Sequence, residues 1–356
     1  MEKKRVVWIE LLRIAACFGV VVLHAASQHF RDVPVDTFVW KVSNFYHGIS
    51  RFAVACFIMI SGALYLDKKR TWNLKKLWLK NILSVAVAYV FWQIFYGIYR
   101  IVITGNSGRG AVWIVKKMLV YVSDAYFHLW YLPMLIGLMI ITPLLWEFVN
   151  CKRGKQWEEY LIILFLIFKI LPYTAAYFPL PWIDHIKALM NTVQPDLVTD
   201  FAGYFILGHY LYEYGLPEKL ERLVYVLGVV FIAGGIGLCQ WKALEQNSAV
   251  QSFYENYTLA AFFWSAAVFL FFRNHIGRIQ WSEKKAEIIC YLGGCTFGIY
   301  LIHAFFRDIL HRAGFDSMFI NNTVIAVPVV AAVIFVTSLI AVILIRHIPV
   351  LKKWIV

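Results

Sequence analysis

Arg13 and His24 are the residues whose types and spacing first suggest chemistry. They lie eleven positions apart in one apolar run, from Val6 to Ala26. At ~100° per residue, that spacing places both side chains within ~20° of each other on one helix face, ~16 Å apart along the axis. A guanidinium can bind a phosphate or carboxylate, and a neutral imidazole can take a proton from a hydroxyl. The pair therefore predicts a functional site inside a membrane helix.

Each of these residues also has a structural interpretation. His24 could be a buried imidazole that is hydrogen-bonded to a backbone carbonyl. Arg13 could be the partner of Glu10, which lies three residues earlier on the same face. Glu10 would then orient Arg13, and both interpretations of Arg13 would hold together. Alternatively, Glu10 is only an acid of the first helical turn.

Composition places the whole chain in the membrane. Hydrophobic residues make up 61% of the 356 residues, charged residues only 15%, and the mean hydropathy is +0.66. A soluble domain is nearer half apolar and a quarter charged. The net charge of +13 comes from short basic clusters between apolar runs, a pattern that sets membrane orientation and does not indicate nucleic-acid binding.

Apolar run lengths predict an all-α, polytopic membrane protein with about ten transmembrane helices. The segment from Ala111 to Tyr126 contains Lys116 and Lys117 and is interpreted as an interfacial helix. The predicted spans are roughly 6–26, 45–66, 77–103, 129–149, 159–178, 201–214, 222–241, 257–273, 288–310 and 323–346.

The distribution of Lys and Arg predicts that both termini are cytoplasmic. With the N-terminus inside, 21 of the 34 basic residues fall in inner segments, beginning with Lys3, Lys4 and Arg5, and only 8 in outer segments. Basic residues favour the cytoplasmic side. Arg13 then lies in the inner half of the membrane and His24 in the outer half.

Further polar residues occur near the outer ends of other spans. Arg51 opens the second span, His128 and Trp130 open the fourth, and Tyr300 and His303 share one face of the ninth. His128 and Arg51 lie at the same outer level as His24, so these three side chains could converge there. Alternatively, Arg51 is a snorkelling arginine, Trp130 belongs to an interfacial aromatic belt, and Tyr300 and His303 are core residues with satisfied polar atoms.

Two other features carry weaker predictions. The outer loop from Leu171 to Asp200 is rich in Pro and aromatic residues, includes Pro181 and Asp196, and fits either a membrane belt or a shelf on which a sugar stacks. The six cysteines are scattered without ligand spacing, so we predict neither a disulfide framework nor a metal site.

Taken together, these motifs resemble the membrane acyltransferase 3 family over the whole chain. The strongest element is Arg13 followed by ten residues and His24, within IELLRIAACFGVVVLH. The stretch from Arg51 to the Ser-Gly pair ending at Gly62 is similar to the family's second-span signature. His-Leu-Trp-Tyr-Leu at 128–132 and Thr-Phe-Gly-Ile-Tyr-Leu-Ile-His at 296–303 also resemble family elements.

The resemblance implies a multi-pass enzyme of the cell membrane, similar to stand-alone sugar O-acetyltransferases. Cytoplasmic acetyl-CoA would donate its acyl group to a hydroxyl of an extracytoplasmic glycan, with no permanently bound cofactor. By this likeness His24 is the base, Arg13 helps to hold the donor, and Arg51 is a further site residue. Residues 1–356 would form one transmembrane domain without an added soluble domain.

Two questions stay open at this point. A transporter or flippase for a glycan or lipid-linked intermediate would also explain many spans, intramembrane Arg and His, and an aromatic outer loop. For an enzyme, transfer could be direct or could pass through an acyl group on His24. We prefer direct transfer, with substrate contacts from Arg51, His128, Trp130, Tyr300 and His303.

Overall fold

The computed structural model describes residues 6–105, 108–124, 126–179, 182–185, 188, 192 and 200–355. In this part of the chain the regular structure is helical and no strand forms, which confirms the all-α prediction. Some residues named above lie outside the described ones: Lys3, Lys4, Arg5, Pro181 and Asp196.

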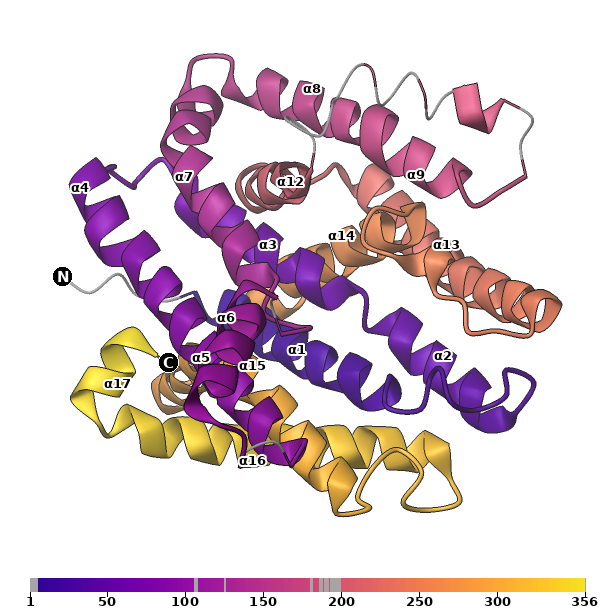
Figure 1. Cartoon of the computed structure of the whole chain (residues 1–356). Helices are drawn as coiled ribbons and strands as arrows, with labels where there is room; N and C mark the ends of the chain where they lie inside the picture. Colours follow the sequence, from indigo (N-terminus) through magenta and orange to yellow (C-terminus); the bar gives the residue numbers. More distant parts are fainter. Residues whose placement is uncertain are drawn as a thin grey trace.

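Helix α1 lies near the centre of the bundle, and α3, α14, α15 and α16 pack against it (Figure 1). The face bearing Arg13 and His24 is therefore turned toward protein. The helices are α1 (Val7–Ala26), α2 (Phe38–Ile49), α3 (Phe52–Tyr65), α4 (Leu74–Lys76), the π-helical η1 (Leu77–Ile82), α5 (Leu83–Ile103), α6 (Ala111–Ser123), α7 (Tyr131–Asn150), α8 (Gly154–Phe165), the π-helical η2 (Leu166–Ile170), α9 (Leu171–Ala175), α12 (Phe201–Glu213), α13 (Glu218–Gln246), α14 (Leu259–Asn274), α15 (Glu283–Arg312), α16 (Thr323–Arg346) and α17 (Pro349–Trp354).

Eight helical segments of the described chain are long and apolar enough to cross a membrane. The protein is thus a multi-pass membrane protein, as predicted. The predicted spans 159–178 and 201–214 fall on α8–α9 and α12 and are not among the eight. Helix α12 has 13 residues, or ~20 Å, which is shorter than the ~30 Å hydrocarbon core. Its apolar residues are buried instead between α3 and α8.

The second predicted span differs from the observed one in a way that moves Arg51. Helices α2 and α3 together form one membrane-length segment, Phe38–Tyr65. Arg51 therefore lies inside this segment, at the break between the two helices, and does not open it. The prediction missed α2 because its polar residues face protein: Asn44 is buried, donates to the carbonyl of Ile236 and accepts from the Tyr254 hydroxyl.

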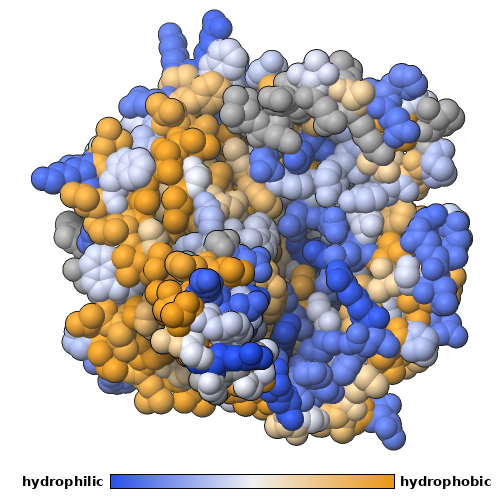
Figure 2. Space-filling model, viewed as in Figure 1, coloured by the Kyte–Doolittle hydropathy of each residue, from blue (hydrophilic) through white to orange (hydrophobic). Residues whose placement is uncertain are grey.

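The surface agrees with a protein embedded in lipid. Hydrophobic residues gather over the left part of the face drawn in Figure 2, where Figure 1 shows α5 and α7. Large apolar side chains on these helices are exposed, among them Phe91, Ile98 and Leu144. The predicted interfacial helix is present as α6, packs on α5, and is not among the eight segments.

Two of the basic segments lie on the same side of the bundle, as the predicted topology requires. Helices α4 and α17 both occupy the left side of Figure 1, and they carry Lys75, Lys76 and Lys352. Both segments were assigned to the cytoplasmic side from their charge. The orientation of the bundle in the membrane stays a prediction.

Glycines bring α3 and α12 into backbone contact. A Cβ added at Gly62 would lie 1.7 Å from the carbonyl oxygen of Phe205, and one at Gly208 would lie 2.1 Å from that of Met59. Real Cβ atoms do not approach backbone oxygens this closely. Small residues that allow such approach are a common means of packing helices in membranes. The contact fixes α3, which forms one wall of the site described below.

We expect Gly208→Ala to destabilise the protein by ~1–3 kcal/mol or more, because the added methyl group must push α3 and α12 apart. The free energy of unfolding in mixed detergent micelles measures this effect. Gly237→Ala is the matched control: its Cβ meets nothing within 4 Å, so the change should be neutral or stabilise α13 by up to ~1 kcal/mol. Equal stabilities for the two variants would contradict the proposed contact.

Candidate active site

A cavity of ≈ 170 Å³ lies beside the face of α1 that carries Arg13 and His24. We call it the Arg13 cavity. Its other walls come from α3, α15 and the segment that leads into α7. The chain thus brings together residues that are nearly 290 positions apart. Five predicted site residues line the cavity: Arg13, His24, His128, Trp130 and Tyr300.

Arg13 is held in place by Glu10, which agrees with one of the two interpretations of Glu10 that the sequence left open. Its Nη1 atom lies 2.8 Å from Oε2 of Glu10. Glu10 is buried, and it fits only because Gly293 of α15 has no side chain: a Cβ there would lie 2.2 Å from Oε2. The guanidinium therefore has one side fixed by a carboxylate while it also lines the cavity. Such a group can bind an anionic or carbonyl oxygen.

His24 is accessible, unlike the backbone-bonded imidazole considered as the structural alternative. Its ring makes contacts with the rings of Phe127 and His303, at centroid distances of 5.0 and 5.2 Å. No described residue hydrogen-bonds to its ring nitrogens. An imidazole with free nitrogens, lining a cavity, can accept a proton from a bound hydroxyl.

His128 and His303 behave differently from His24, because each bonds to a backbone carbonyl. Nδ1 of His303 lies 2.6 Å from the oxygen of Tyr300, and Nε2 of His128 lies 3.3 Å from that of Leu301. A carbonyl only accepts, so these nitrogens carry the proton. The second nitrogen of each ring is buried without a described partner. Tyr300 also donates its hydroxyl to the carbonyl of His128, which ties α15 to the start of α7.

Arg51 lies apart from the Arg13 cavity. Its Nη2 atom is 3.2 Å from Nδ1 of His47 and donates to the amide oxygen of Gln251 at 3.3 Å. Its guanidinium lies 5.3 Å from the ring centroid of Tyr254. It is held by protein groups and does not snorkel to a lipid surface. These contacts aim it into a second cavity.

This second cavity, here called the Arg51 cavity, has a volume of ≈ 530 Å³. It lies around the C-terminal end of α1, whereas the Arg13 cavity extends along α1 from Arg13 to His24, and it is rich in cations. Its lining includes Arg31, Arg51 and Arg307 with one acid, Asp32. His24 lines both cavities. A group bound on either side can therefore reach the same imidazole.

A third cavity, of ≈ 390 Å³, lies beyond the end of α3 and is lined by Lys69, Arg70 and Lys76. We call it the Lys76 cavity. The guanidinium of Arg70 contacts two aromatic rings there, 4.3 Å from the centroid of Tyr65 and 4.5 Å from that of Trp72. Its Nη1 donates to the carbonyl of Leu64 at 3.2 Å. Such contacts orient an arginine while leaving its other N–H groups available for an anion.

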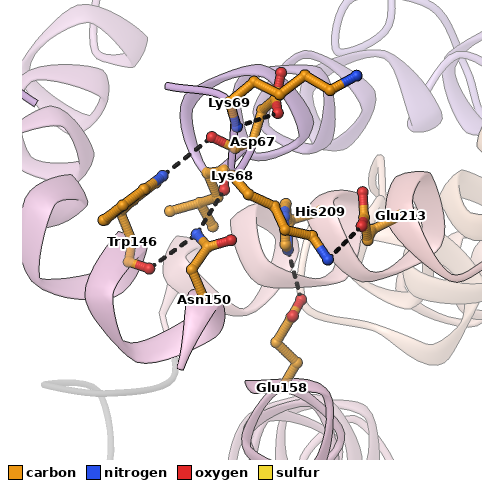
Figure 3. Close-up of polar contacts among 9 residues, drawn as sticks. Asp67, Lys68, Lys69, Trp146, Asn150, Glu158, His209 and Glu213 are labelled. Carbon is orange, nitrogen blue, oxygen red and sulfur yellow. Dashed lines mark hydrogen bonds and ion pairs between the residues drawn. The ribbon is translucent and has the colours of Figure 1, made fainter. Parts of the chain in front are cut away.

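Hydrogen bonds from α7 fix the segment after α3, which leads into the residues that line the Lys76 cavity (Figure 3). Trp146 donates to the carbonyl of Asp67, and Asn150 donates to that of Leu66, each at 3.0 Å. Lys68 lies 2.8 Å from Glu213 of α12, and this hydrogen bond raises the pKa of Lys68. The segment after α3 is thus attached to two helices.

A buried ionisable pair lies beside this network (Figure 3). Nδ1 of His209 in α12 lies 2.8 Å from Oε2 of Glu158 in α8, and both side chains are almost completely buried. Glu158 was not singled out from the sequence, where it appears as one acid beside another, Glu159. The pair joins α12 to α8 in the part of the fold that supports the Lys76 cavity.

The aromatic outer loop is partly packed against protein. Tyr173 and Tyr177 donate their hydroxyls to Glu255 at 3.3 and 3.2 Å. Glu255 in turn accepts from Gln251, the residue that holds Arg51. These tyrosines are therefore neither a plain lipid belt nor an open shelf. They are connected by hydrogen bonds to the wall of the Arg51 cavity.

The chain as a whole was compared with known proteins. A family model described as an acyltransferase domain, that of the acyltransferase 3 family, matches residues 6–346. The chain belongs to the acyltransferase 3 family. No curated protein and no solved structure matches it significantly. Membership makes the protein a membrane acyltransferase and favours this class over the transporter or flippase.

Sequence reasoning missed His47 and Gln251, which hold Arg51 in this acyltransferase. His47 had a usable signal, because it precedes Arg51 by four residues and so lies on the same helix face. Gln251 had none, since 200 positions separate it from Arg51. Ser61, which was not proposed as a site residue, also lines the Arg13 cavity. Its hydroxyl already donates to the carbonyl of Phe57 at 2.9 Å.

Proposed function

We propose that this acyltransferase moves an acetyl group from cytoplasmic acetyl-CoA to a hydroxyl of an extracytoplasmic cell-surface glycan, with His24 as the general base. The observation that supports this most is that His24 lines both the Arg13 cavity and the Arg51 cavity. One cavity would hold the thioester and the other the acceptor. The two substrates would then meet at one imidazole without sharing an entrance.

The chemistry needs one proton transfer and one acyl transfer. His24 takes the proton of the acceptor hydroxyl while that oxygen attacks the thioester carbonyl. The new C–O bond forms, the C–S bond breaks, and the thiolate of coenzyme A leaves toward the donor side. The imidazolium of His24 then returns its proton to the thiolate or to water. Arg13, fixed by Glu10, would position the donor.

The charges of the cavities suit the two substrates. The Lys76 cavity presents Lys69, Arg70 and Lys76, which match the phosphates of coenzyme A. The pantetheine arm is long and would reach from there into the Arg13 cavity, whose lining is mostly apolar and aromatic. The Arg51 cavity is polar, as expected for a hydroxylated acceptor.

Incubating the purified protein with radiolabelled acetyl-CoA and a cell-envelope glycan extract tests the donor and acceptor classes. Label should appear in the glycan, and adding unlabelled acetyl-CoA should lower the amount of label that the glycan receives. Longer acyl-CoA donors, tested alongside, show whether the acyl group is acetyl. If the folded protein neither binds acetyl-CoA nor labels any acceptor, the proposed donor is wrong.

We expect Lys76→Ala to raise KM for acetyl-CoA roughly threefold to tenfold, because one phosphate contact is lost. KM for acetylpantetheine, which has no phosphates, should not change. Lys75→Ala is the matched control: Lys75 is the neighbouring lysine and is exposed like Lys76, but it does not line the cavity. Steady-state kinetics with both donors would contradict the assignment if Lys75→Ala and Lys76→Ala behaved alike.

A further inference from the structure

Three metal-ligating side chains meet outside the cavities described above. They are His29, in the segment after α1, His311, in the last turn of α15, and Asp316, in the connection to α16. One ligand atom from each lies within 4.8 Å of the others. The cluster contains no cysteine, and His29 is 282 positions from His311, so cysteine spacing could not have revealed it.

The two known distances are close to those of a tetrahedral metal site. Nε2 of His29 and Nδ1 of His311 each lie 3.0 Å from Oδ2 of Asp316. Zinc bonds to imidazole nitrogen and carboxylate oxygen are ~2.0–2.2 Å long, which puts two tetrahedral ligand atoms ~3.3–3.5 Å apart. The two nitrogen–oxygen distances therefore need to lengthen by only a few tenths of an ångström. The two imidazole nitrogens, which lie within 4.8 Å of each other, would have to be ~3.3–3.5 Å apart.

The contacts of Asp316 orient its carboxylate toward the two imidazoles. Its Oδ1 accepts from the backbone N–H of Met318 at 2.8 Å, which leaves Oδ2 to face the two imidazoles. A ligand anchored by a second hydrogen bond is typical of built metal sites.

We propose that His29, His311 and Asp316 bind one Zn²⁺ ion that links the segment after α1 to the α15–α16 connection. Two imidazoles and one carboxylate suit zinc and similar borderline cations and do not suit Mg²⁺ or Ca²⁺, which prefer oxygen ligands. The half-exposed ring of His311 leaves an entry path and room for a water as fourth ligand.

The ion would also act on the acyltransferase site. Residues 27, 28 and 30–32, on either side of His29, line the Arg51 cavity. The backbone N–H of Ser317, next to Asp316, already donates to the side-chain amide oxygen of Gln28 at 3.2 Å. A bound Zn²⁺ would reinforce this link and restrain the rim through which the acceptor would enter.

Zinc binding to the full-length protein, freed of any affinity tag and stripped with a chelator, tests the proposal. Equilibrium dialysis against Zn²⁺ alone with elemental analysis should give one ion per chain, and Zn²⁺ should raise the melting temperature. His311→Ala and Asp316→Asn should each weaken binding at least tenfold and abolish the thermal shift. His347→Ala, at an exposed histidine on another segment, should bind as the wild type does.

His311→Ala keeps the test decisive if the other substitution disturbs folding, since His311 is the most exposed of the three ligands. Co²⁺ provides a second readout, because its visible spectrum reports a tetrahedral site of nitrogen and oxygen ligands. Substoichiometric zinc in the wild type would overturn the proposal. Unchanged binding in folded His311→Ala would overturn it as well, since the zinc would then lie elsewhere.

Discussion

Replacing His24 by alanine should lower kcat for acyl transfer by ~10²–10⁴-fold, the usual contribution of a general base. The imidazole lines both cavities and has no hydrogen bond from a described residue, so its loss removes a proton acceptor without breaking a polar contact. Initial rates with saturating acetyl-CoA and acceptor measure the effect. Binding of acetyl-CoA should be nearly unchanged.

Two controls make this result interpretable. Folding of the variant is checked by its melting temperature. His347→Ala, at a residue that lines none of the three cavities, should retain full activity. If folded His24→Ala transfers acyl groups at the wild-type rate, the base lies elsewhere, and His128 and His303 are the next candidates. Rapid denaturation near neutral pH during turnover also tests the two routes: label retained on the wild-type protein but not on His24→Ala would indicate an acyl group on His24 and contradict direct transfer.

The second large effect concerns stability. His209→Ala should destabilise the protein by ~3–5 kcal/mol, because it leaves the carboxylate of Glu158 buried without its partner. The free energy of unfolding in mixed detergent micelles measures the loss. Since α12 and α8 support the segment that begins the Lys76 cavity, KM for acetyl-CoA should rise as well.

Glu159→Ala is the matched control for this prediction. Glu159 adjoins Glu158, but its side chain is 44% exposed, so its loss should cost no more than ~1 kcal/mol. The double variant Glu158→Ala with His209→Ala should be much less destabilised than the sum of the single variants, because it removes both members of the pair. An additive double variant would show that the pair makes no specific interaction.

Helical periodicity was sufficient to predict the relative placement of three residues of the candidate site. Arg13, His24 and Glu10 belong to one regular helix, so their relative positions follow from spacing alone, and the structure places them accordingly. His128, Trp130 and Tyr300 reach the same cavity through tertiary packing. The sequence showed only that His128 could meet His24 at a common depth, because helix packing decides which residues converge, and the contacts that hold them were not predictable.

Other features depended on contacts that one sequence does not encode locally. The break at Arg51 was missed because α2 buries polar residues such as Asn44 against α13, which lowered its apparent hydrophobicity. Helix α12 was predicted as a span because it is apolar, although it is short and its apolar surface faces α3. The cluster of His29 with His311 and Asp316 joins distant segments and left no spacing signal.

Outward transfer across a sealed membrane tests the central claim most directly. Vesicles are loaded with radiolabelled acetyl-CoA, and an impermeant hydroxyl acceptor is supplied outside. Orientation is quantified with an impermeant maleimide at Cys151, an exposed cysteine that follows Asn150 and so lies near the Lys76 cavity. We predict labelled acceptor outside, in proportion to the molecules whose Cys151 faces the lumen. Label that appears only when donor and acceptor share one compartment would contradict a site in which His24 joins two cavities.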